Sequence, residues 1–289
     1  MDTQTVTSRH LDVPGGRIYY EVRGSGPLLL VIGQPMTSGY FAPLAELLAD
    51  DRTVVTYDPR GVGQSTVEDR SLDVTPELEA DDLAAVVDAV GGGPADVFGS
   101  SGGAVAGLAL VARHPDKVAT LIAHEPPVCD LLPDSAHIRA AVNGVEDAYR
   151  THGPGAAFGR FVSIVMHQGP VTEDGVPPAA WPPPGAEQPE GQGAPPQRSA
   201  KEQADDELFL LRMLKPFTRY EPDVDVLRSA GPTVVVAVGD SSHGEISCRS
   251  AEALAKQLGS PPVLFPGDHG GFMADPAGFA AAIRQTCAR

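Results

Sequence analysis

Five consecutive residues, Gly99-Ser100-Ser101-Gly102-Gly103, follow the pattern G-x-S-x-G. Residues 95–98 before them, Ala-Asp-Val-Phe, are typical of a short strand, and residues 102–113 after them are typical of a helix. A serine on so sharp a strand-to-helix turn presents its hydroxyl above the sheet edge, and the flanking glycines keep neighbouring side chains from colliding. The pattern therefore predicts Ser101 as a nucleophile. Ser100 does not fit, because Phe98 stands where a glycine would be required.

A serine hydroxyl is a weak nucleophile at neutral pH and needs a base within hydrogen-bond reach. His269 lies in a glycine-rich loop between an expected strand at 262–265 and an expected helix at 276–287. A loop in this place faces the same edge of a parallel sheet as the turn that carries Ser101. We therefore predict His269 as the general base. His243, in the loop after an expected strand at 233–238, is the second candidate.

The segments that must position these residues alternate between strand and helix character. Apolar runs typical of strands occupy residues 17–22, 28–32, 53–57, 95–98, 118–123, 233–238 and 262–265. Apolar residues with helical spacing occupy 41–49, 76–90, 102–113, 247–258 and 276–287. This alternation, with nearly continuous apolar strands, predicts an α/β fold in which a mostly parallel sheet is covered by helices on both faces.

The alternation stops between residues 126 and 230. Helices are expected there at 136–149, 156–166 and 201–214, whereas the proline- and glycine-rich excursion at 176–197 cannot continue either regular structure. We predict a core formed by residues 1–125 and 231–289 and a mainly helical cap formed by 126–230. The large apolar side chains of this cap are candidate pocket residues: Phe158, Phe161, Met166, Trp181, Phe209, Met213 and Phe217.

Composition restricts the partners of the protein. A formal net charge of -17 repels phosphate backbones and anionic lipid surfaces, so we expect neither nucleic acid nor membrane as a partner. The cysteines, Cys129, Cys248 and Cys287, are too widely spaced for a disulfide framework or a zinc site. No signal-like leader opens the chain. We expect a cytoplasmic protein with a small-molecule substrate, no cofactor and no metal; the sequence indicates no oligomeric state.

Two further segments make the chain resemble the α/β-hydrolase superfamily. Residues 58–65, Asp-Pro-Arg-Gly-Val-Gly-Gln-Ser, match its D-x-R-G-x-G-x-S turn, which we interpret as scaffold. Gly33-Gln34-Pro35 resembles its H-G-x-P turn, with Ile32 in place of the usual histidine. The resemblance implies an oxyanion hole formed by the backbone N–H groups of Gln34 and Gly102.

The resemblance covers about residues 1–125 and 231–289. It implies the α/β-hydrolase fold, a mostly parallel sheet flanked by helices, with a cap inserted after strand six of the family's sheet. In this chain strand six is the expected strand at 118–123, and the cap is the segment 126–230.

The resemblance leaves two positions for the carboxylate that orients the base. Members of the superfamily commonly carry an aspartate three residues after the glycine that ends strand seven; from Gly239 that position is Ser242, and Asp240 stands one residue after the glycine. Some haloalkane dehalogenases instead carry a glutamate just after strand six, and Glu125 occupies a similar place. Either carboxylate could accept the Nδ1–H of the base. We prefer Glu125 and keep Asp240 as the alternative.

The identity of the residue at position 101 restricts the class of reaction. Related enzymes with aspartate there form alkyl-enzyme esters, whereas Ser101 points to acyl transfer. We predict a serine hydrolase that attacks an ester, lactone, thioester or activated C–C carbonyl of a small hydrophobic substrate through an acyl-enzyme. The alternatives are a non-hydrolytic enzyme on the same scaffold, such as a lyase, perhydrolase, acyltransferase or cyclase, and a non-catalytic ligand-binding relative.

Overall fold

The computed structural model describes residues 5–177 and 199–288. In these residues the chain forms one nine-stranded sheet in the order β1-β2-β4-β3-β6-β7-β8-β9, with β5 paired to β2. Its strands are β1 (Thr7–Val13), β2 (Gly16–Arg23), β3 (Leu28–Gln34), β4 (Thr53–Tyr57), β5 (Thr66–Val67), β6 (Ala95–Ser101), β7 (Val118–His124), β8 (Thr233–Gly239) and β9 (Val263–Phe265). Neighbours from β4 to β9 are parallel, which confirms the mostly parallel sheet; β1 and β2 join antiparallel at one edge.

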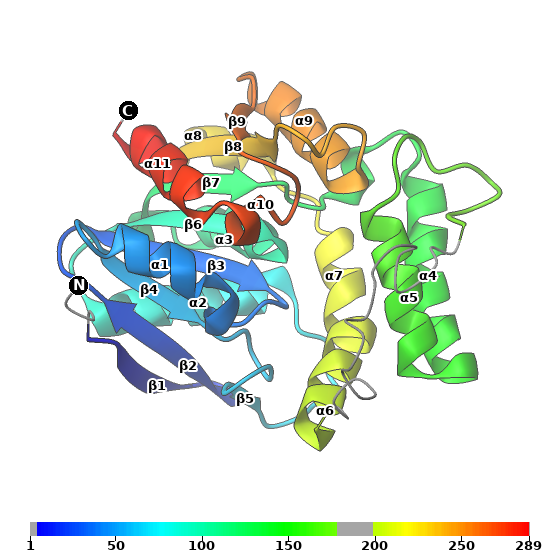
Figure 1. Cartoon of the computed structure of the whole chain (residues 1–289), viewed down its shortest axis with the longest axis horizontal. Coiled ribbons are helices and arrows are strands. Elements are labelled where there is room, and N and C mark those ends of the chain that lie inside the picture. Colours follow the sequence, from blue (N-terminus) through cyan, green and yellow to red (C-terminus); the bar gives the residue numbers. More distant parts are fainter. Residues whose placement is uncertain (1–4, 178–198, 289) are drawn as a thin grey trace, which may run out of the picture.

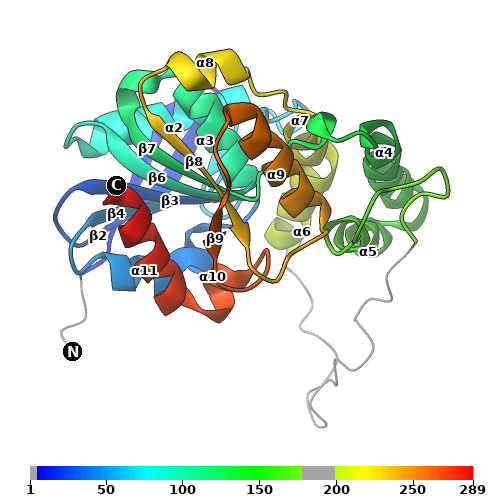
Figure 2. The same ribbon diagram turned by 90° about the horizontal axis from the view of Figure 1, so that it is seen from above.

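Helices cover both faces of the sheet (Figure 1), because successive side chains of a strand point to opposite faces. Leu28, Leu30 and Ile32 of β3 belong to a core shared with α2, α3, α8 and α9. Leu29 and Val31 pack on the other face with α1, α10 and α11. Figure 2 shows α2 and α3 on one side of the sheet and α10 and α11 on the other. These helices are α1 (Ala42–Leu48), α2 (Pro76–Val90), α3 (Gly102–Arg113), α8 (Val224–Ser229), α9 (Ile246–Leu258), α10 (Gly271–Ala274) and α11 (Pro276–Cys287).

Between β7 and β8 the chain leaves the sheet and forms α4 (Ser135–His152), α5 (Pro154–Val165), α6 (Ala200–Leu208) and α7 (Leu214–Thr218) before α8. We call α4 to α7 the inserted helices; Figure 1 shows them beyond the carboxyl ends of the parallel strands. A π-helical turn over Phe209–Met213 joins α6 to α7. Most of the excursion expected at 176–197 lies outside the described residues.

Two features that bear on partners can be stated for the described residues. None of their helices is both long and apolar enough to cross a lipid bilayer. They also hold no cluster of three or more His, Cys, Asp and Glu side chains arranged to bind a metal ion.

Candidate active site

Ser101 stands at the end of β6 in a backbone conformation that side chains rarely adopt. Its φ is 56° and its ψ is -125°, and α3 begins at the next residue. The surrounding backbone leaves no room for a side chain at two positions of this turn, and glycine occupies both. A Cβ at Gly99 would lie 2.6 Å from the carbonyl oxygen of Gly103, and one at Gly103 would lie 2.5 Å from that of Ile32. This strand–turn–helix geometry is the context that the G-x-S-x-G pattern requires.

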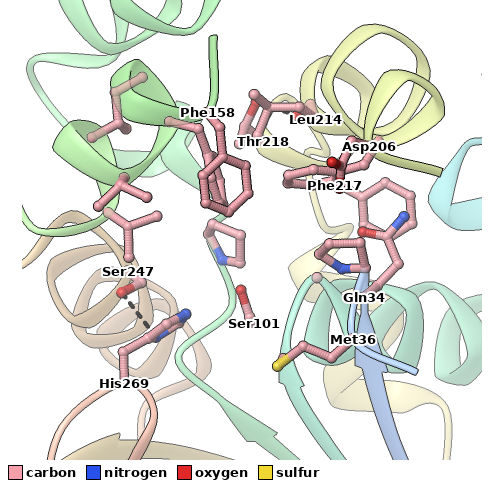
Figure 3. Close-up of a pocket in the computed structure, with 18 of the residues that line it drawn as sticks. Gln34, Met36, Ser101, Phe158, Asp206, Leu214, Phe217, Thr218, Ser247 and His269 are labelled. Atoms are coloured by element: carbon pink, nitrogen blue, oxygen red, sulfur yellow. Dashed lines mark hydrogen bonds between the residues drawn. The ribbon is translucent and has the colours of Figure 1, made fainter. Parts of the chain in front are cut away.

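The structure brings Glu125 and His269 together. Nδ1 of His269 lies 2.6 Å from Oε2 of Glu125. With Nδ1–H donated to the carboxylate, Nε2 of the ring is left without a proton and can accept one. Figure 3 shows the imidazole turned toward the hydroxyl of Ser101, and both residues line the same cavity.

Glu125 is held rigidly at the end of β7. Its side chain is 0% exposed, and its φ of 47° is again unusual for a residue with a side chain. Oε1 accepts a hydrogen bond from the backbone N–H of Gly239 at 2.9 Å and another from the hydroxyl of Ser242. Burial raises the pKa of this carboxyl, but its hydrogen bond and electrostatic interaction with His269 outweigh the effect of burial and lower the pKa to about 2. Glu125 is therefore ionised at neutral pH.

Asp240 and His243, the alternative acid and the alternative base, both lie in exposed parts of the loop after β8. Oδ1 of Asp240 accepts hydrogen bonds from the backbone N–H of Gly267 at 2.9 Å and from the hydroxyl of Ser241 at 2.8 Å. The carboxylate of Asp240 thus connects the loop after β8 to the loop that contains Gly267. Among the described residues, His243 does not line the cavity. The site commonly occupied by the acid carries Ser242, whose hydroxyl binds Glu125.

Gln34 and Gly102, the predicted oxyanion-hole residues, lie against each other at the sheet edge. Gln34 ends β3 and is the register partner of Ser101 across the sheet. A Cβ at Gly102 would lie 2.7 Å from the carbonyl oxygen of Gln34, so only glycine permits this approach. Gly102 also opens the twelve-residue helix α3, whose amino end favours negative charge. Both residues line the cavity that contains Ser101.

The cavity above Ser101 has a volume of about 650 Å³ and lies between the sheet edge and the inserted helices (Figure 3). Of the candidate pocket residues, Phe158, Phe161, Phe209 and Phe217 line it. Met166 is exposed and Met213 is buried away from the lining. Trp181 lies outside the described residues.

Two residues that sequence reasoning missed adjoin His269. The hydroxyl of Ser247, near the start of α9, lies 3.2 Å from Nδ1 and lines the cavity. The ring of His124 stacks on that of His269 with centroids 6.3 Å apart. Burial lowers the pKa of His124 to about 4, so this ring is neutral at pH 7. His124 was visible as the residue before Glu125, whereas no sequence signal marks Ser247.

Two sets of hydrogen bonds hold the turn at 58–65 in place. Asp58 accepts hydrogen bonds from the backbone N–H groups of Ser38 at 2.8 Å and Gln64 at 2.7 Å. Arg60 instead forms a buried pair with Asp82 of α2, at 2.5 Å and 2.8 Å. The turn is therefore tied to the segment after β3 and to the helix beneath it.

A buried carboxyl beneath this turn predicts an unusual pH dependence of stability. Burial and the negative charge of Asp82 raise the pKa of Glu79 from 4.5 to about 8. Between these values the folded protein holds a proton that the unfolded chain releases, so the free energy of unfolding falls as pH rises through this window. Glu79→Gln, which cannot ionise, should reduce that fall, as measured by urea unfolding at about pH 5 and about pH 8. Glu77→Gln on the same helix is the matched control. The prediction would be contradicted if the free energy of unfolding fell as much between these two pH values in Glu79→Gln as in the wild-type protein.

Comparison with known proteins identifies the family. The family model described as alpha/beta hydrolase fold matches residues 26–274. The chain is 30% identical over 273 residues to the uncharacterized hydrolase YraK of Bacillus subtilis (strain 168), which covers 93% of this chain and 91% of that protein. The chain therefore belongs to the alpha/beta hydrolase family. It is also 37% identical over 122 residues to the putative carbamate hydrolase RutD of Caulobacter vibrioides (strain NA1000 / CB15N), which is 42% of this chain and 44% of that protein.

Solved structures share the fold across nearly the whole chain. A thermophilic esterase from Thermogutta terrifontis superposes with a TM-score of 0.65 at 22% identity, covering 99% of this chain and 98% of the esterase. The enol-lactonase from Burkholderia xenovorans LB400 superposes with a TM-score of 0.60 at 16% identity, covering 97% of this chain and 100% of the lactonase. At these identities the likeness shows the fold alone, and the chemistry must be argued from the site.

Proposed function

We propose that this protein is a serine hydrolase that cleaves an ester, lactone, thioester or activated C–C carbonyl bond of a small hydrophobic substrate through an acyl-enzyme. Ser101 is the nucleophile, His269 the general base, and Glu125 the carboxylate that orients His269. The observation that carries the proposal is the contact of 2.6 Å between Nδ1 of His269 and the buried carboxylate of Glu125, beside a serine on a strained turn in the same cavity.

Acylation uses each of these groups at a defined atom. Nε2 of His269 takes the proton of Ser101 as Oγ forms a bond to the substrate carbonyl carbon. The negative charge then moves to the former carbonyl oxygen, where the backbone N–H groups of Gln34 and Gly102 donate hydrogen bonds. Collapse of this intermediate breaks the bond to the leaving group, and the imidazolium of His269 returns the proton to that group.

Deacylation repeats the sequence with water. His269 takes a proton from a water molecule as its oxygen bonds to the acyl carbon, and the same two N–H groups hold the oxyanion. Cleavage of the bond to Ser101 releases the carboxylic acid, and His269 returns the proton to Oγ. Glu125 stays ionised throughout and stabilises the imidazolium that forms in each half of the cycle.

We further propose that residues 126–230 act as a cap that selects the substrate. Phe158 of α5 and Phe217 of α7 form walls of the cavity, so the inserted helices contribute directly to its lining. A volume of about 650 Å³ lies within the range of small-molecule sites.

Covalent labelling tests the proposal. A fluorophosphonate probe should attach to the intact protein once, at Ser101, as located by mass spectrometry of the peptides. Ser101→Ala should remove the label, whereas the matched control Ser100→Ala, one residue earlier on β6, should retain it. Folding of both variants is checked by circular dichroism. Labelling at another residue, or none in a folded wild-type protein, would refute the proposed nucleophile.

A further inference from the structure

The side chain of Gln34 holds a polar group that the proposed mechanism does not use. The mechanism takes its backbone N–H, but the residue is only 3% exposed and its carboxamide is enclosed. Nε2 is shielded from solvent and has no hydrogen-bond partner among the described residues. A buried donor without a partner is unfavourable and rare in folded proteins. Its position at a ligand cavity therefore suggests that a ligand supplies the partner.

The carboxamide lies next to the reacting centre. Gln34 lines the cavity together with Ser101 and Gly102, and its Oε1 lies 2.8 Å from the position that a Cβ at Gly102 would take. Oε1 rather than Nε2 is thus the amide atom next to Gly102, and a half-turn about the last side-chain bond exchanges the two atoms and brings the N–H to this position. Figure 3 shows Gln34 across the cavity from His269.

We propose that the carboxamide of Gln34 binds the acyl part of the substrate, and that preferred substrates carry an ether, carbonyl or hydroxyl oxygen within two carbons of the scissile carbonyl. This inference rests on the proposed function. The leaving group must lie near His269, which protonates it, so the acyl part extends toward the opposite wall, where Gln34 stands. The two backbone N–H groups already serve the oxyanion, and the carboxamide reaches beyond them.

Matched esters test this contact. 4-Nitrophenyl 3-methoxypropanoate and 4-nitrophenyl pentanoate differ by one oxygen in place of a methylene group, as do the methoxyacetate and the butanoate. The measured quantity is the ratio of kcat/KM for the oxygen-containing ester to that for its alkyl partner. Gln34→Met keeps the length and the backbone N–H but removes the amide, and it should lower this ratio about tenfold for at least one pair. Met36→Leu, a change of another cavity residue, should leave the ratio within about twofold.

Binding measured without turnover separates this inference from the proposed function. The same esters are titrated calorimetrically into Ser101→Ala and into Ser101→Ala combined with Gln34→Met. The ratio of the dissociation constant of the oxygen-containing ester to that of its alkyl partner should rise about tenfold in the double variant, because the lost contact weakens binding of the oxygen-containing ester alone. This result is expected whether or not the wild-type protein hydrolyses the esters. Ratios that Gln34→Met leaves unchanged in both pairs would overturn the inference. An equal loss of kcat/KM on both esters of a pair would do so as well, because it would assign the amide to the oxyanion.

Discussion

Ser101→Ala lowers kcat/KM for short 4-nitrophenyl esters by about 10⁴-fold or more, and His269→Ala lowers it by a similar factor. The expectation follows from the proposed roles of the two side chains, nucleophile for Ser101 and general base for His269. Without the hydroxyl no acyl-enzyme forms, and without the imidazole the hydroxyl keeps its proton at the moment of attack. Initial rates measured by nitrophenolate release provide the test, with circular dichroism and thermal unfolding showing that each variant remains folded.

The double variant sharpens this prediction. Because the two groups act as one unit, Ser101→Ala combined with His269→Ala should be no slower than either single change by more than a few fold. Multiplying losses would mean that the two residues act in separate steps. His243→Ala is the matched control, since His243 is exposed on the loop after β8. A severe loss in this control, with little loss in His269→Ala, would assign the base to His243.

The turn and the sheet could be predicted because both depend on local chemistry. Glycines are required around Ser101 because a Cβ would lie 2.7 Å or less from neighbouring backbone atoms, and this requirement is visible in five consecutive residues of the sequence. Buried parallel strands such as β3 are apolar throughout and stand out from their surroundings. The family match over residues 26–274 agrees with this interpretation.

Other features depend on contacts between distant segments and left weaker signals. β1 lies at the sheet edge with mostly exposed side chains, so it lacks the apolar run of a buried strand. The helix expected at 201–214 extends through a π-helical turn to Thr218, where packing overrides the simple helical repeat. Ser247 contacts His269 from α9, which packs beside β8, and no local sequence motif indicates this contact.

The orienting carboxylate, Glu125 or Asp240, likewise depends on contacts between distant segments that the sequence does not reveal. Both follow buried strands and both lie at the carboxyl edge of the sheet. The sequence cannot tell which carboxylate turns inward, because this depends on the φ of 47° at Glu125 and on hydrogen bonds from Gly239 and Ser242. Asp240 turns instead toward the backbone of Gly267.

Glu125→Gln should lower kcat by about 10⁴-fold while Asp240→Asn changes it by less than about tenfold. A glutamine amide at position 125 can donate to Nδ1, which places the ring proton on Nε2 and leaves that atom unable to accept the proton of Ser101. The binding of substrate should change much less, so the loss falls on kcat rather than on KM. A larger loss in Asp240→Asn than in Glu125→Gln would assign the orienting carboxylate to the other loop.

Exchange of two neighbouring residues gives an independent check of this geometry. The hydroxyl of Ser242 donates to the carboxylate of Glu125, so a carboxylate at position 242 would lie close to the one it replaces. Glu125→Ser combined with Ser242→Asp should therefore recover at least about tenfold of the kcat lost in Glu125→Ser alone. Ser242→Asp alone should destabilise the fold, because it buries a second negative charge against Glu125, which is 0% exposed. Recovery in the exchanged protein would support a carboxylate that acts through its contact with His269, and no recovery in a folded exchanged protein would contradict that role.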